Sequence, residues 1–398
     1  MDNSGQWQVS EKEYRNLSRG FGYYKFICLG LCLVFILGGL AVFKDDITVE
    51  NFRYLIKYID IGSGDLAGKQ GHISFDSAES SGSTAGIYRN DLVLLNKNNF
   101  EVFDFSGGKV YNDTFSMSEP SLNVSSRYVF CYDLGGKTAR LYNSFSLVWQ
   151  QSYEYPIFCG DVNDMGNYAV ATSEKNYHSA VYVYNSASQQ IFKWLSADKY
   201  VSDVALADNN SDKLCVAALR AENGDFITDL LFFSVNDKES SALVSFPGEM
   251  PLKTYATEDC AMLMTDVALH FVSYDGTELA SVKYSSESLG MYGFFRDGAV
   301  LVLDDNSVGG ARQVLFCNKE KGKAAEFSVD KQIVDVSKFE DCVYLLCTDA
   351  ILVLDTSSGE IESYTVEGEY TQLFVTGEGS CVLVNSFGAD LTVLDKQT

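Results

Sequence analysis

Proline, histidine and tryptophan are scarce in this chain, with 4, 3 and 3 copies among 398 residues. So few prolines leave long stretches free to pair as β-strands, because proline cannot donate a hydrogen bond to a sheet. Glycine, tyrosine and phenylalanine are plentiful by contrast, which suits many paired strands joined by glycine turns. The three histidines, His72, His178 and His270, are far apart in the sequence. We therefore expect each of them to have a structural role.

The motifs of the common enzyme and metal sites are also missing. The chain contains no G-x-S-x-G, Walker A, H-E-x-x-H, EF-hand or C-x-x-C sequence. Residues 161–164 (DVND) resemble the start of a calcium loop, but Met165 occupies the fifth position and no Glu occupies the twelfth. We interpret this segment as a hairpin turn with Gly166. The sequence therefore predicts no catalytic residue, no cofactor and no metal site.

Basic residues are few relative to acidic ones, and the formal net charge is −24. Residues 1–43 contain four basic and three acidic residues, so the remaining 26 basic and 51 acidic residues give the rest of the chain a charge of −25. A surface this acidic repels nucleic acid and anionic membranes. The charge serves solubility, or it indicates a cationic partner or metal ions.

One segment has no charge at all over eighteen residues. Residues 26–43 (FICLGLCLVFILGGLAVF) are long enough to span a bilayer, with Tyr23 and Tyr24 as interfacial anchors. A cleaved signal peptide is the alternative, but the segment is long for one and no A-x-A site follows before Lys44. We expect a transmembrane helix that attaches the protein to a membrane.

The residues on either side of this segment predict its orientation. Four basic residues precede it in a tail of residues 1–25, and acidic residues dilute the basic ones that follow. This distribution favours a cytoplasmic amino terminus and an extracytoplasmic remainder. Ser10-x-x-Glu13 has the spacing of a capping box and predicts a short helix over residues 11–19.

Beyond the hydrophobic segment, a short apolar phrase that closes with Asp or Asn recurs eight times. Successive copies are 39, 42, 51, 39, 43, 37 and 40 residues apart, and they end at Asp104, Asn143, Asn185, Asn236, Asp275, Asn318, Asp355 and Asp395. A period near 40 residues is typical of β-propeller blades. The closing Asp or Asn can accept a hydrogen bond from the backbone two residues on and so begin a tight turn. We predict an all-β, eight-bladed propeller preceded by one transmembrane helix, with seven blades as the alternative.

The repeat also sets the domain boundaries. We expect a cytoplasmic tail (1–25), a transmembrane helix (26–43), a juxtamembrane helix and linker (44–71) and a propeller (72–398). Residues 48–60 place apolar side chains on one face of a helix. The last copy lacks an outer strand, so we expect the lone strand at 72–76 to pair there and close the ring. The one long spacing predicts a loop insertion over residues 220–229.

The propeller contains eight cysteines. Cys215, Cys260, Cys342 and Cys381 all begin the second strand of different repeats, so the ring should hold them apart. Cys342 and Cys347 should face opposite sides of one strand. We expect most of these cysteines to be small buried apolar residues.

Propellers usually bind partners through the loops that join one blade to the next. In this chain those loops include residues 152–156, 246–251, 285–292 and 366–370, and they combine aromatic with acidic side chains. They predict a peptide, protein or glycan partner. The candidate partner-binding residues are Tyr153, Glu154, Tyr155, Phe246, Glu249, Tyr292, Glu369 and Tyr370.

The phrases at 181–194 (VYVYNSASQQIFKW) and 352–364 (LVLDTSSGEIESY) are similar to the repeats of WD40-like and PQQ/YVTN-type propellers. The whole layout resembles that of membrane-anchored bacterial propeller proteins of the cell envelope, a resemblance that implies no particular activity. The tryptophans of quinone-binding repeats are missing, since only Trp149 and Trp194 lie in the propeller.

Two functions follow as hypotheses. The first is a non-catalytic, membrane-tethered binding or scaffold module at the cell envelope. The alternative is an extracytoplasmic hydrolase or lyase with carboxylates at the central channel.

Overall fold

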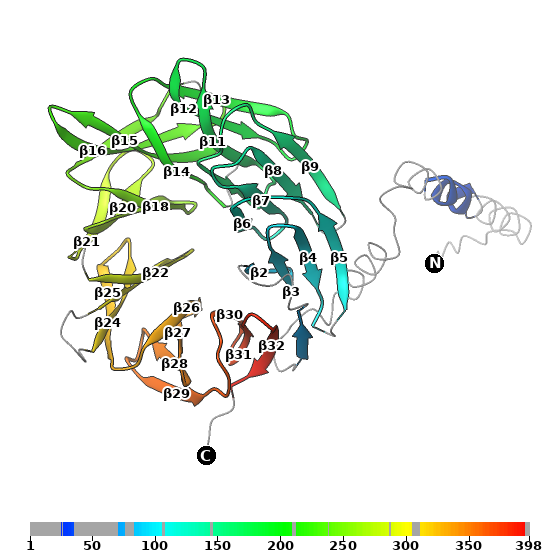
Figure 1. Ribbon diagram of the computed structural model, residues 1–398, viewed down its shortest axis with the longest axis vertical. Coiled ribbons are helices and arrows are strands. Elements are labelled where there is room, and N and C mark those ends of the chain that lie inside the picture. Colours follow the sequence, from blue (N-terminus) through cyan, green and yellow to red (C-terminus); the bar gives the residue numbers. More distant parts are fainter. Residues whose placement is uncertain are drawn as a thin grey trace, which may run out of the picture.

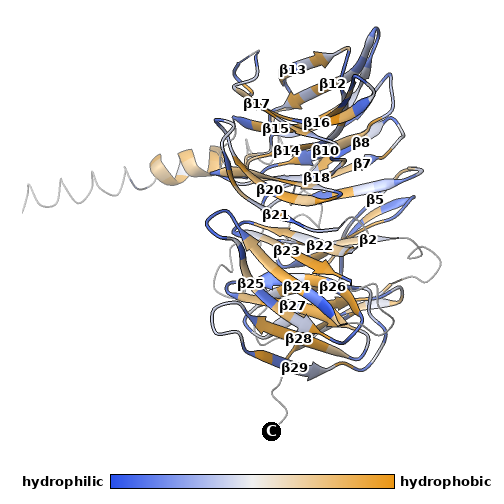
Figure 2. Cartoon of the chain, turned by 90° about the vertical axis from the view of Figure 1, so that its left-hand side faces the viewer, coloured by the Kyte–Doolittle hydropathy of each residue, from blue (hydrophilic) through white to orange (hydrophobic). Residues whose placement is uncertain are grey.

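The computed structural model describes residues 25, 27–35, 71–75, 83–105, 108–143, 146–208, 212–237, 239–285, 288–304 and 311–394. Within these residues, 32 strands form eight four-stranded antiparallel sheets around a central opening (Figure 1). The prediction of an all-β, eight-bladed propeller is confirmed, and the seven-bladed alternative is excluded. Hydrophobic residues concentrate along the strands, and many of the loops are hydrophilic (Figure 2).

The blades follow one another along the chain. Blade 1 contains β2 (Thr84–Tyr88), β3 (Asp91–Leu95), β4 (Asn99–Phe103) and β5 (Lys109–Thr114). Blade 2 contains β6 (Pro120–Val124), β7 (Val129–Asp133), β8 (Thr138–Tyr142) and β9 (Leu147–Ser152). Blade 3 contains β10 (Cys159–Val162), β11 (Tyr168–Glu174), β12 (Tyr177–Tyr184) and β13 (Gln190–Ser196). Blade 4 contains β14 (Tyr200–Leu206), β15 (Lys213–Glu222), β16 (Asp225–Ser234) and β17 (Ala242–Pro247).

The second half of the ring has the same order. Blade 5 contains β18 (Pro251–Ala256), β19 (Cys260–Thr265), β20 (Ala268–Ser273) and β21 (Glu278–Lys283). Blade 6 contains β22 (Leu289–Phe295), β23 (Gly298–Leu303), β24 (Arg312–Asn318) and β25 (Gly322–Val329). Blade 7 contains β26 (Ile333–Phe339), β27 (Cys342–Cys347), β28 (Ala350–Asp355) and β29 (Ile361–Thr365). Blade 8 contains β30 (Gln372–Gly377), β31 (Ser380–Val384), β32 (Gly388–Val393) and β1 (Gly71–Ser74).

This antiparallel order gives the disc two distinct sides. The connections between second and third strands, and those between successive blades, share one side, which we call the loop face. The turns between first and second strands, and between third and fourth strands, share the opposite side, which we call the turn face. The first strand of each blade lines the central opening.

The ring closes as expected, through a strand from the amino-terminal side of the chain. Strand β1 pairs antiparallel with β32, from Gly71 opposite Leu391 to Ser74 opposite Gly388. Ile73 is buried in a cluster that includes Val382. Because β1 begins opposite the end of β32, the chain enters the disc at the turn face.

The closing Asp or Asn of the repeated phrase forms the predicted turn in six copies. In each of these copies the side-chain oxygen accepts a hydrogen bond from a backbone N–H two to four residues later. The residues are Asp104, Asn143, Asn185, Asp275, Asn318 and Asp355. These bonds hold the turns between third and fourth strands. The turn after Asp161 is also a hairpin, with Gly166 at a φ of +79°.

The extra residues lie at 220–229 as predicted, but they extend a hairpin and do not form a loop. Strands β15 and β16 pair continuously out to Glu222 opposite Asp225. Asn223 and Gly224 form the tip, with φ of 54° and 92°. An Asn-Gly pair favours this turn because both positions need positive φ.

The amino-terminal part contains a short helix over residues 27–35. In the part of the chain that the structure describes, no helix has both the length and the apolar character needed to cross a membrane. The rest of the predicted membrane segment, at 26 and 36–43, lies outside the described residues, as do the predicted helices at 11–19 and 48–60.

Apolar side chains from neighbouring blades form the core. The eight propeller cysteines belong to this core, and seven of them are buried, as predicted. All ten cysteines of the chain are free thiols. Burial raises the pKa of Cys347 to about 11 and that of Cys381 to about 12, so both stay protonated and unreactive near neutral pH. Cys342 and Cys347 lie in different clusters, on opposite sides of β27.

Candidate partner-binding face

The four predicted segments all include a connection between successive blades, although Phe246 belongs to β17 and Tyr292 to β22. They therefore lie on the loop face, but their side chains differ widely in exposure. Tyr155 and Tyr292 are half-buried, whereas Glu154 and Glu369 are exposed. The ring of Tyr292 packs edge-on against Phe294, with 5.7 Å between the ring centroids.

Two of the predicted residues belong to the core. Tyr153 is buried in the cluster between blades 2 and 3, beside Tyr168 and Tyr184. Phe246 is buried between blades 4 and 5, and its ring centroid lies 4.1 Å from that of His270. In this conformation neither side chain can contact a partner, so both act by holding the loop face in place.

Glu249 and Tyr370 are fixed by hydrogen bonds within the protein. Glu249 Oε2 lies 2.8 Å from His270 Nε2 and accepts a hydrogen bond of 2.8 Å from the Thr265 hydroxyl. On the other side of the same imidazole, Glu278 Oε1 lies 2.7 Å from Nδ1. The Tyr370 hydroxyl donates to Asp390 Oδ2 at 2.7 Å. These contacts fix the connections entering blades 5 and 8.

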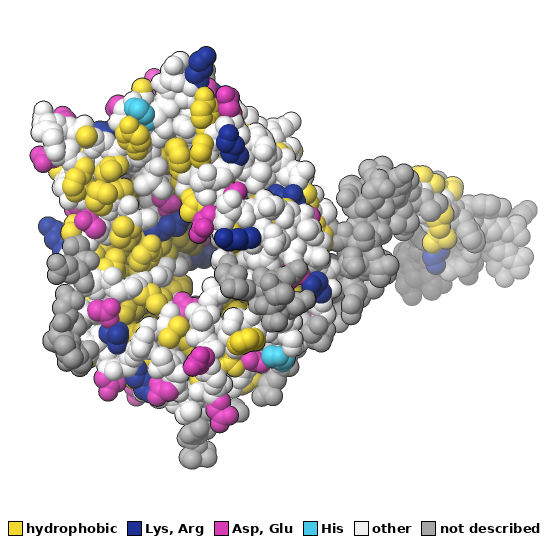
Figure 3. Space-filling view, viewed as in Figure 1, with side chains coloured by type: hydrophobic (Ala, Val, Ile, Leu, Met, Phe, Trp, Pro, Cys, Tyr) yellow, Lys and Arg dark blue, Asp and Glu magenta, His cyan; other side chains and the backbone are white. Residues whose placement is uncertain are grey.

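The exposed aromatic side chains are distributed unequally between the two faces. Among the described residues of the propeller, seven large hydrophobic side chains are exposed on the loop face, with exposed fractions between 39% and 72%. These are Leu134, Tyr177, Tyr200, Phe226, Met250, Leu252 and Phe387. Met165 is exposed on the turn face, and four aliphatic residues, Ile191, Leu243, Leu279 and Ile361, are exposed at the turn-face ends of outer strands, so none of the large hydrophobic side chains described as exposed on that side is aromatic. Hydrophobic side chains gather on the left half of the face that Figure 3 shows, around the central opening.

The densest part of this apolar surface lies on blades 3 and 4. His178 and Tyr200 are stacked with ring centroids 4.5 Å apart, and Tyr177 precedes His178 at the start of β12. Phe226 lies near the tip of the extended β15–β16 hairpin. We call Tyr177, His178, Tyr200 and Phe226 the aromatic platform. The sequence prediction missed it because it considered only the connections between blades, although Asn223-Gly224 marks a projecting hairpin.

Acidic side chains of the first strands join neighbouring blades around the central opening. Three carboxylates each accept a backbone hydrogen bond from the first strand of the next blade. The pairs are Asp161 with Leu206 N at 2.8 Å, Asp203 with Thr254 N at 2.7 Å, and Asp335 with Leu373 N at 2.7 Å. We call Asp161, Asp203 and Asp335 the inner-strand carboxylates. Nothing in the repeated phrase indicated them, because they lie outside it.

These carboxylates bear on the hydrolase or lyase alternative. Both oxygens of Asp161 accept hydrogen bonds, Oδ1 from the Asn123 amide at 3.0 Å and Oδ2 from Leu206 N at 2.8 Å. Both oxygens of Asp203 are also bonded, Oδ1 to Lys253 Nζ at 2.9 Å and Oδ2 to Thr254 N at 2.7 Å. Burial raises the pKa of Asp161 to about 6. Their geometry accounts for them as links between blades and leaves neither with a free oxygen for proton transfer.

Comparison with known proteins gives a family and a fold. Residues 69–390 match the model described as "Family of unknown function (DUF5711)". No curated protein matches the sequence. BamB from Moraxella catarrhalis is similar in structure, with a TM-score of 0.52 and 8% identity over 81% of this chain and 99% of that one. This similarity supports the propeller fold alone.

Two further solved structures are more distant. AztD from Citrobacter koseri has a TM-score of 0.49 and 8% identity, and the match covers 78% of this chain and 89% of that chain. The WD40 domain of SCAP from fission yeast has a TM-score of 0.48 and 9% identity, with 83% and 97% covered.

Proposed function

Because this chain belongs to the family of unknown function DUF5711, its activity must be argued from its own surface, and we propose that it is a membrane-tethered, extracytoplasmic propeller that binds a protein or peptide partner through its loop face. The observation that carries the proposal is that the four exposed large aromatic side chains of the described propeller, Tyr177, Tyr200, Phe226 and Phe387, all lie on the loop face. Apolar patches of this kind mark interaction sites on soluble domains, and aromatic residues and Met are enriched at interfaces.

The tether is supported by the helix at residues 27–35. It has apolar side chains on all sides, and its large hydrophobic residues are 56% to 86% exposed. A helix that is hydrophobic all round needs an apolar environment, which a bilayer supplies. Since the chain enters the disc at the turn face, a tether at this end leaves the loop face open to a partner.

Cysteine labelling on intact cells tests the tether and its orientation. A membrane-impermeant maleimide should label a thiol introduced by Asp330→Cys on the loop face, and should reach Ser4→Cys only after the cells are permeabilised. The unmodified protein is the control, because its eight propeller thiols are free but largely buried. The reverse labelling pattern would refute the orientation, and recovery of the protein in the soluble fraction would refute the tether.

Site-specific photocrosslinking tests the partner face. A benzophenone amino acid at Tyr200 or Phe226 should give a discrete crosslinked adduct in intact membranes. The same group at Met165, which is equally exposed on the turn face, is the matched control and should give none. Adducts of the same size and yield from both faces, or none from the loop face, would contradict the proposal.

A further inference from the structure

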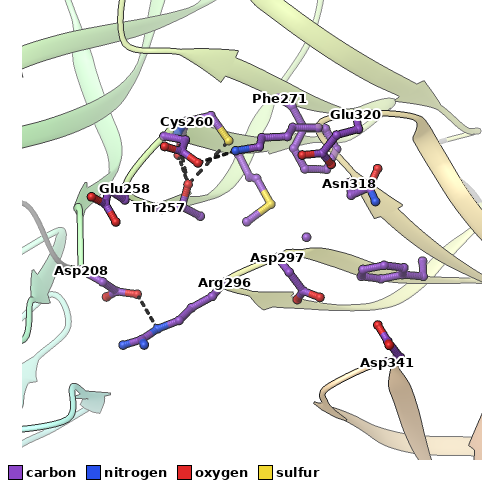
Figure 4. Close-up of a pocket in the computed structure, with 15 residues that line it drawn as sticks. Asp208, Thr257, Glu258, Cys260, Phe271, Arg296, Asp297, Asn318, Glu320 and Asp341 are labelled. Atoms are coloured by element: carbon purple, nitrogen blue, oxygen red, sulfur yellow. Dashed lines mark hydrogen bonds and ion pairs between the residues drawn. The ribbon is translucent and has the colours of Figure 1, made fainter. Parts of the chain in front are cut away.

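A cavity of about 430 Å³ opens on the turn face between blades 5 and 6 (Figure 4). Blade 5 contributes the turn after β18 and parts of β19 and β20, and blade 6 contributes its β22–β23 turn and the end of β24. Asp208 of blade 4 and Asp341 of blade 7 complete the lining. The cavity is on the opposite side of the disc from the proposed partner face, so it requires an explanation of its own.

The floor of the cavity is apolar. Met262, Phe271 and Phe316 line it, and all three are buried in the cores of their blades. Phe316 offers its exposed edge to the cavity and Met262 and Phe271 lie directly beneath the surface, so the bottom of the cleft favours the apolar part of a ligand, because contact there removes that part from water. A small hydrated ion would gain nothing from such a floor.

The rim of the cavity is acidic. The lining contains two basic residues, Arg296 and Lys319, and six acidic ones, which gives a formal charge of −4. The acidic residues are Asp208, Glu258, Asp259, Asp297, Glu320 and Asp341. Charge at this rim therefore favours a cationic ligand.

Three of the acidic residues already have cationic partners within the protein. Asp259 pairs with Lys319 at 2.5 Å, Asp297 with Lys338 at 2.5 Å, and Asp208 with Arg296 at 3.5 Å. Two of these cationic side chains, Lys319 and Arg296, line the cavity themselves.

The other three acidic side chains, Glu258, Glu320 and Asp341, form no ion pair with any described residue. They extend from the turns of three different blades around the space shown in Figure 4. Lys213 approaches Glu258 but donates to its backbone carbonyl, at 3.0 Å. Three separate negative charges are thus left around one apolar floor.

We infer that this cavity binds an organic cation that carries two or more ammonium or guanidinium groups on an aliphatic chain. The chain lies against Phe316, above the buried Met262 and Phe271, and the charged groups reach Glu258, Glu320 and Asp341. A metal ion does not fit the same residues, since the described part of the chain has no group of three His, Cys, Asp or Glu side chains close enough to hold one. This site is independent of the partner proposed for the loop face.

Titration calorimetry of the purified full-length protein at physiological ionic strength tests the site. The probes are spermidine, 1,5-diaminopentane and the uncharged 1,5-pentanediol, together with acetyl-Lys-Gly-Lys-amide and its Gln-for-Lys counterpart. We expect saturable binding of spermidine with a Kd below about 1 mM, weaker binding of the diamine, and none of the diol. Tighter binding of the lysine peptide than of spermidine would identify the source of the cation as a protein segment, and the opposite order would identify it as a free polyamine.

Substitutions separate this cavity from the general negative charge of the protein. The triple variant Glu258→Gln, Glu320→Gln, Asp341→Asn should weaken the binding of spermidine about tenfold, because each exposed ion pair changes affinity about two- to fivefold. The control is Glu239→Gln, Asp330→Asn, Glu367→Gln, which removes the same charge from exposed positions outside the cavity. Equal weakening by both variants, or no binding of any cation by the wild-type protein, would overturn the inference. Neither result would alter the crosslinking test of the loop face.

Discussion

The two faces of the disc differ in how their residues are used. On the turn face, hydrogen bonds and ion pairs connect the turns of different blades. The Tyr88 hydroxyl donates to Arg127 O at 2.6 Å, linking blade 1 to blade 2. Asp164 accepts from Ser126 N at 2.7 Å and from Arg296 at 2.9 Å, linking blade 3 to blades 2 and 6. The loop face also has such links, for example from Val201 N of blade 4 to Ser179 Oγ of blade 3 at 2.9 Å. It differs from the turn face in that it also carries the exposed aromatic side chains.

The difference indicates that links between blades occur on both sides, whereas exposed aromatic side chains suited to a partner occur on the loop face. Turns on the turn face must hold their own backbone and also contact the next blade, so few residue types suit them. Connections on the loop face can differ in length, as the extended β15–β16 hairpin does. Substitutions should therefore affect stability where a side chain links blades or is buried, and binding where an aromatic side chain is exposed on the loop face.

Opening the ring should have the largest effect, because both faces depend on closure. Deletion of residues 71–74 removes β1, exposes the edge of β32 and removes the buried side chain of Ile73. We expect the free energy of unfolding to fall by at least about 4 kcal/mol, measured by urea titration. His72→Ala is the control, since this exposed side chain contacts only its immediate surroundings, and it should cost less than about 1 kcal/mol. Unchanged stability after the deletion would show that β1 is dispensable.

Removing an inner-strand carboxylate should have the next largest effect. Asp203→Ala leaves the N–H and hydroxyl of buried Thr254 without their acceptor and leaves Lys253 without its carboxylate. We expect a loss of about 2–4 kcal/mol in chemical denaturation. Asp203→Asn keeps one acceptor oxygen and should lose less. Equal losses for the two variants would mean that the carboxylate does not link blades 4 and 5.

Asp161 should make stability depend on pH in a particular window. Burial raises its pKa from 3.8 to about 6, so between these values the folded state binds more protons than the unfolded state. The stability that this group contributes is full below pH 3.8 and is lost as the pH rises through about 6. Asp161→Asn lacks this dependence, so its stability relative to the wild type should improve between pH 4 and 7, measured by denaturation midpoints.

Asp355 provides the control for this pH dependence. Hydrogen bonds from the side chain and backbone of Ser357 and from the backbone of Ser358 lower the pKa of Asp355. The stability it contributes is present above pH 3.8 and is lost only at lower pH. Asp355→Asn should therefore differ from the wild type by a constant amount between pH 4 and 7. A slope for Asp355→Asn, or none for Asp161→Asn, would contradict the assignment.

Substitutions in the aromatic platform should have the smallest effect on stability. Tyr200→Ser and Phe226→Ser remove exposed rings and should change the free energy of unfolding by less than about 0.5 kcal/mol. Tyr168→Ser, at a fully buried tyrosine, should cost about 3–5 kcal/mol in the same assay. A large loss from either platform variant would show that the platform supports the fold and is not a free binding surface.

The repeat made the architecture predictable from sequence. A recurrent strand ending in Asp or Asn encodes both a blade and its turn, so eight copies predicted eight blades. The missing outer strand of the last copy likewise predicted closure by the segment before the first. These inferences succeed because strand pattern and turn chemistry are local properties of the chain.

The residues that distinguish the two faces were harder to predict. Asp161 and Asp203 bind backbone groups about fifty residues away, in the next blade, so their role depends on the curvature of the ring. Tyr153 lies in a polar connection that folds back onto the core, and Phe246 lies near the end of outer strand β17, and both rings are buried. Burial at the edge of a blade depends on the neighbouring blade, which the local sequence does not describe.

Closure by β1 and β32 also sets an order of events during synthesis. Strand β1 leaves the ribosome before every other strand of the propeller, and its partner β32 leaves last. Until then β1 has no neighbour in its own sheet, and seven blades must exist as an open arc. A ribosome that stops short of β32 therefore releases a chain with two unpaired edges, one at each end of the arc, and both can pair with another chain.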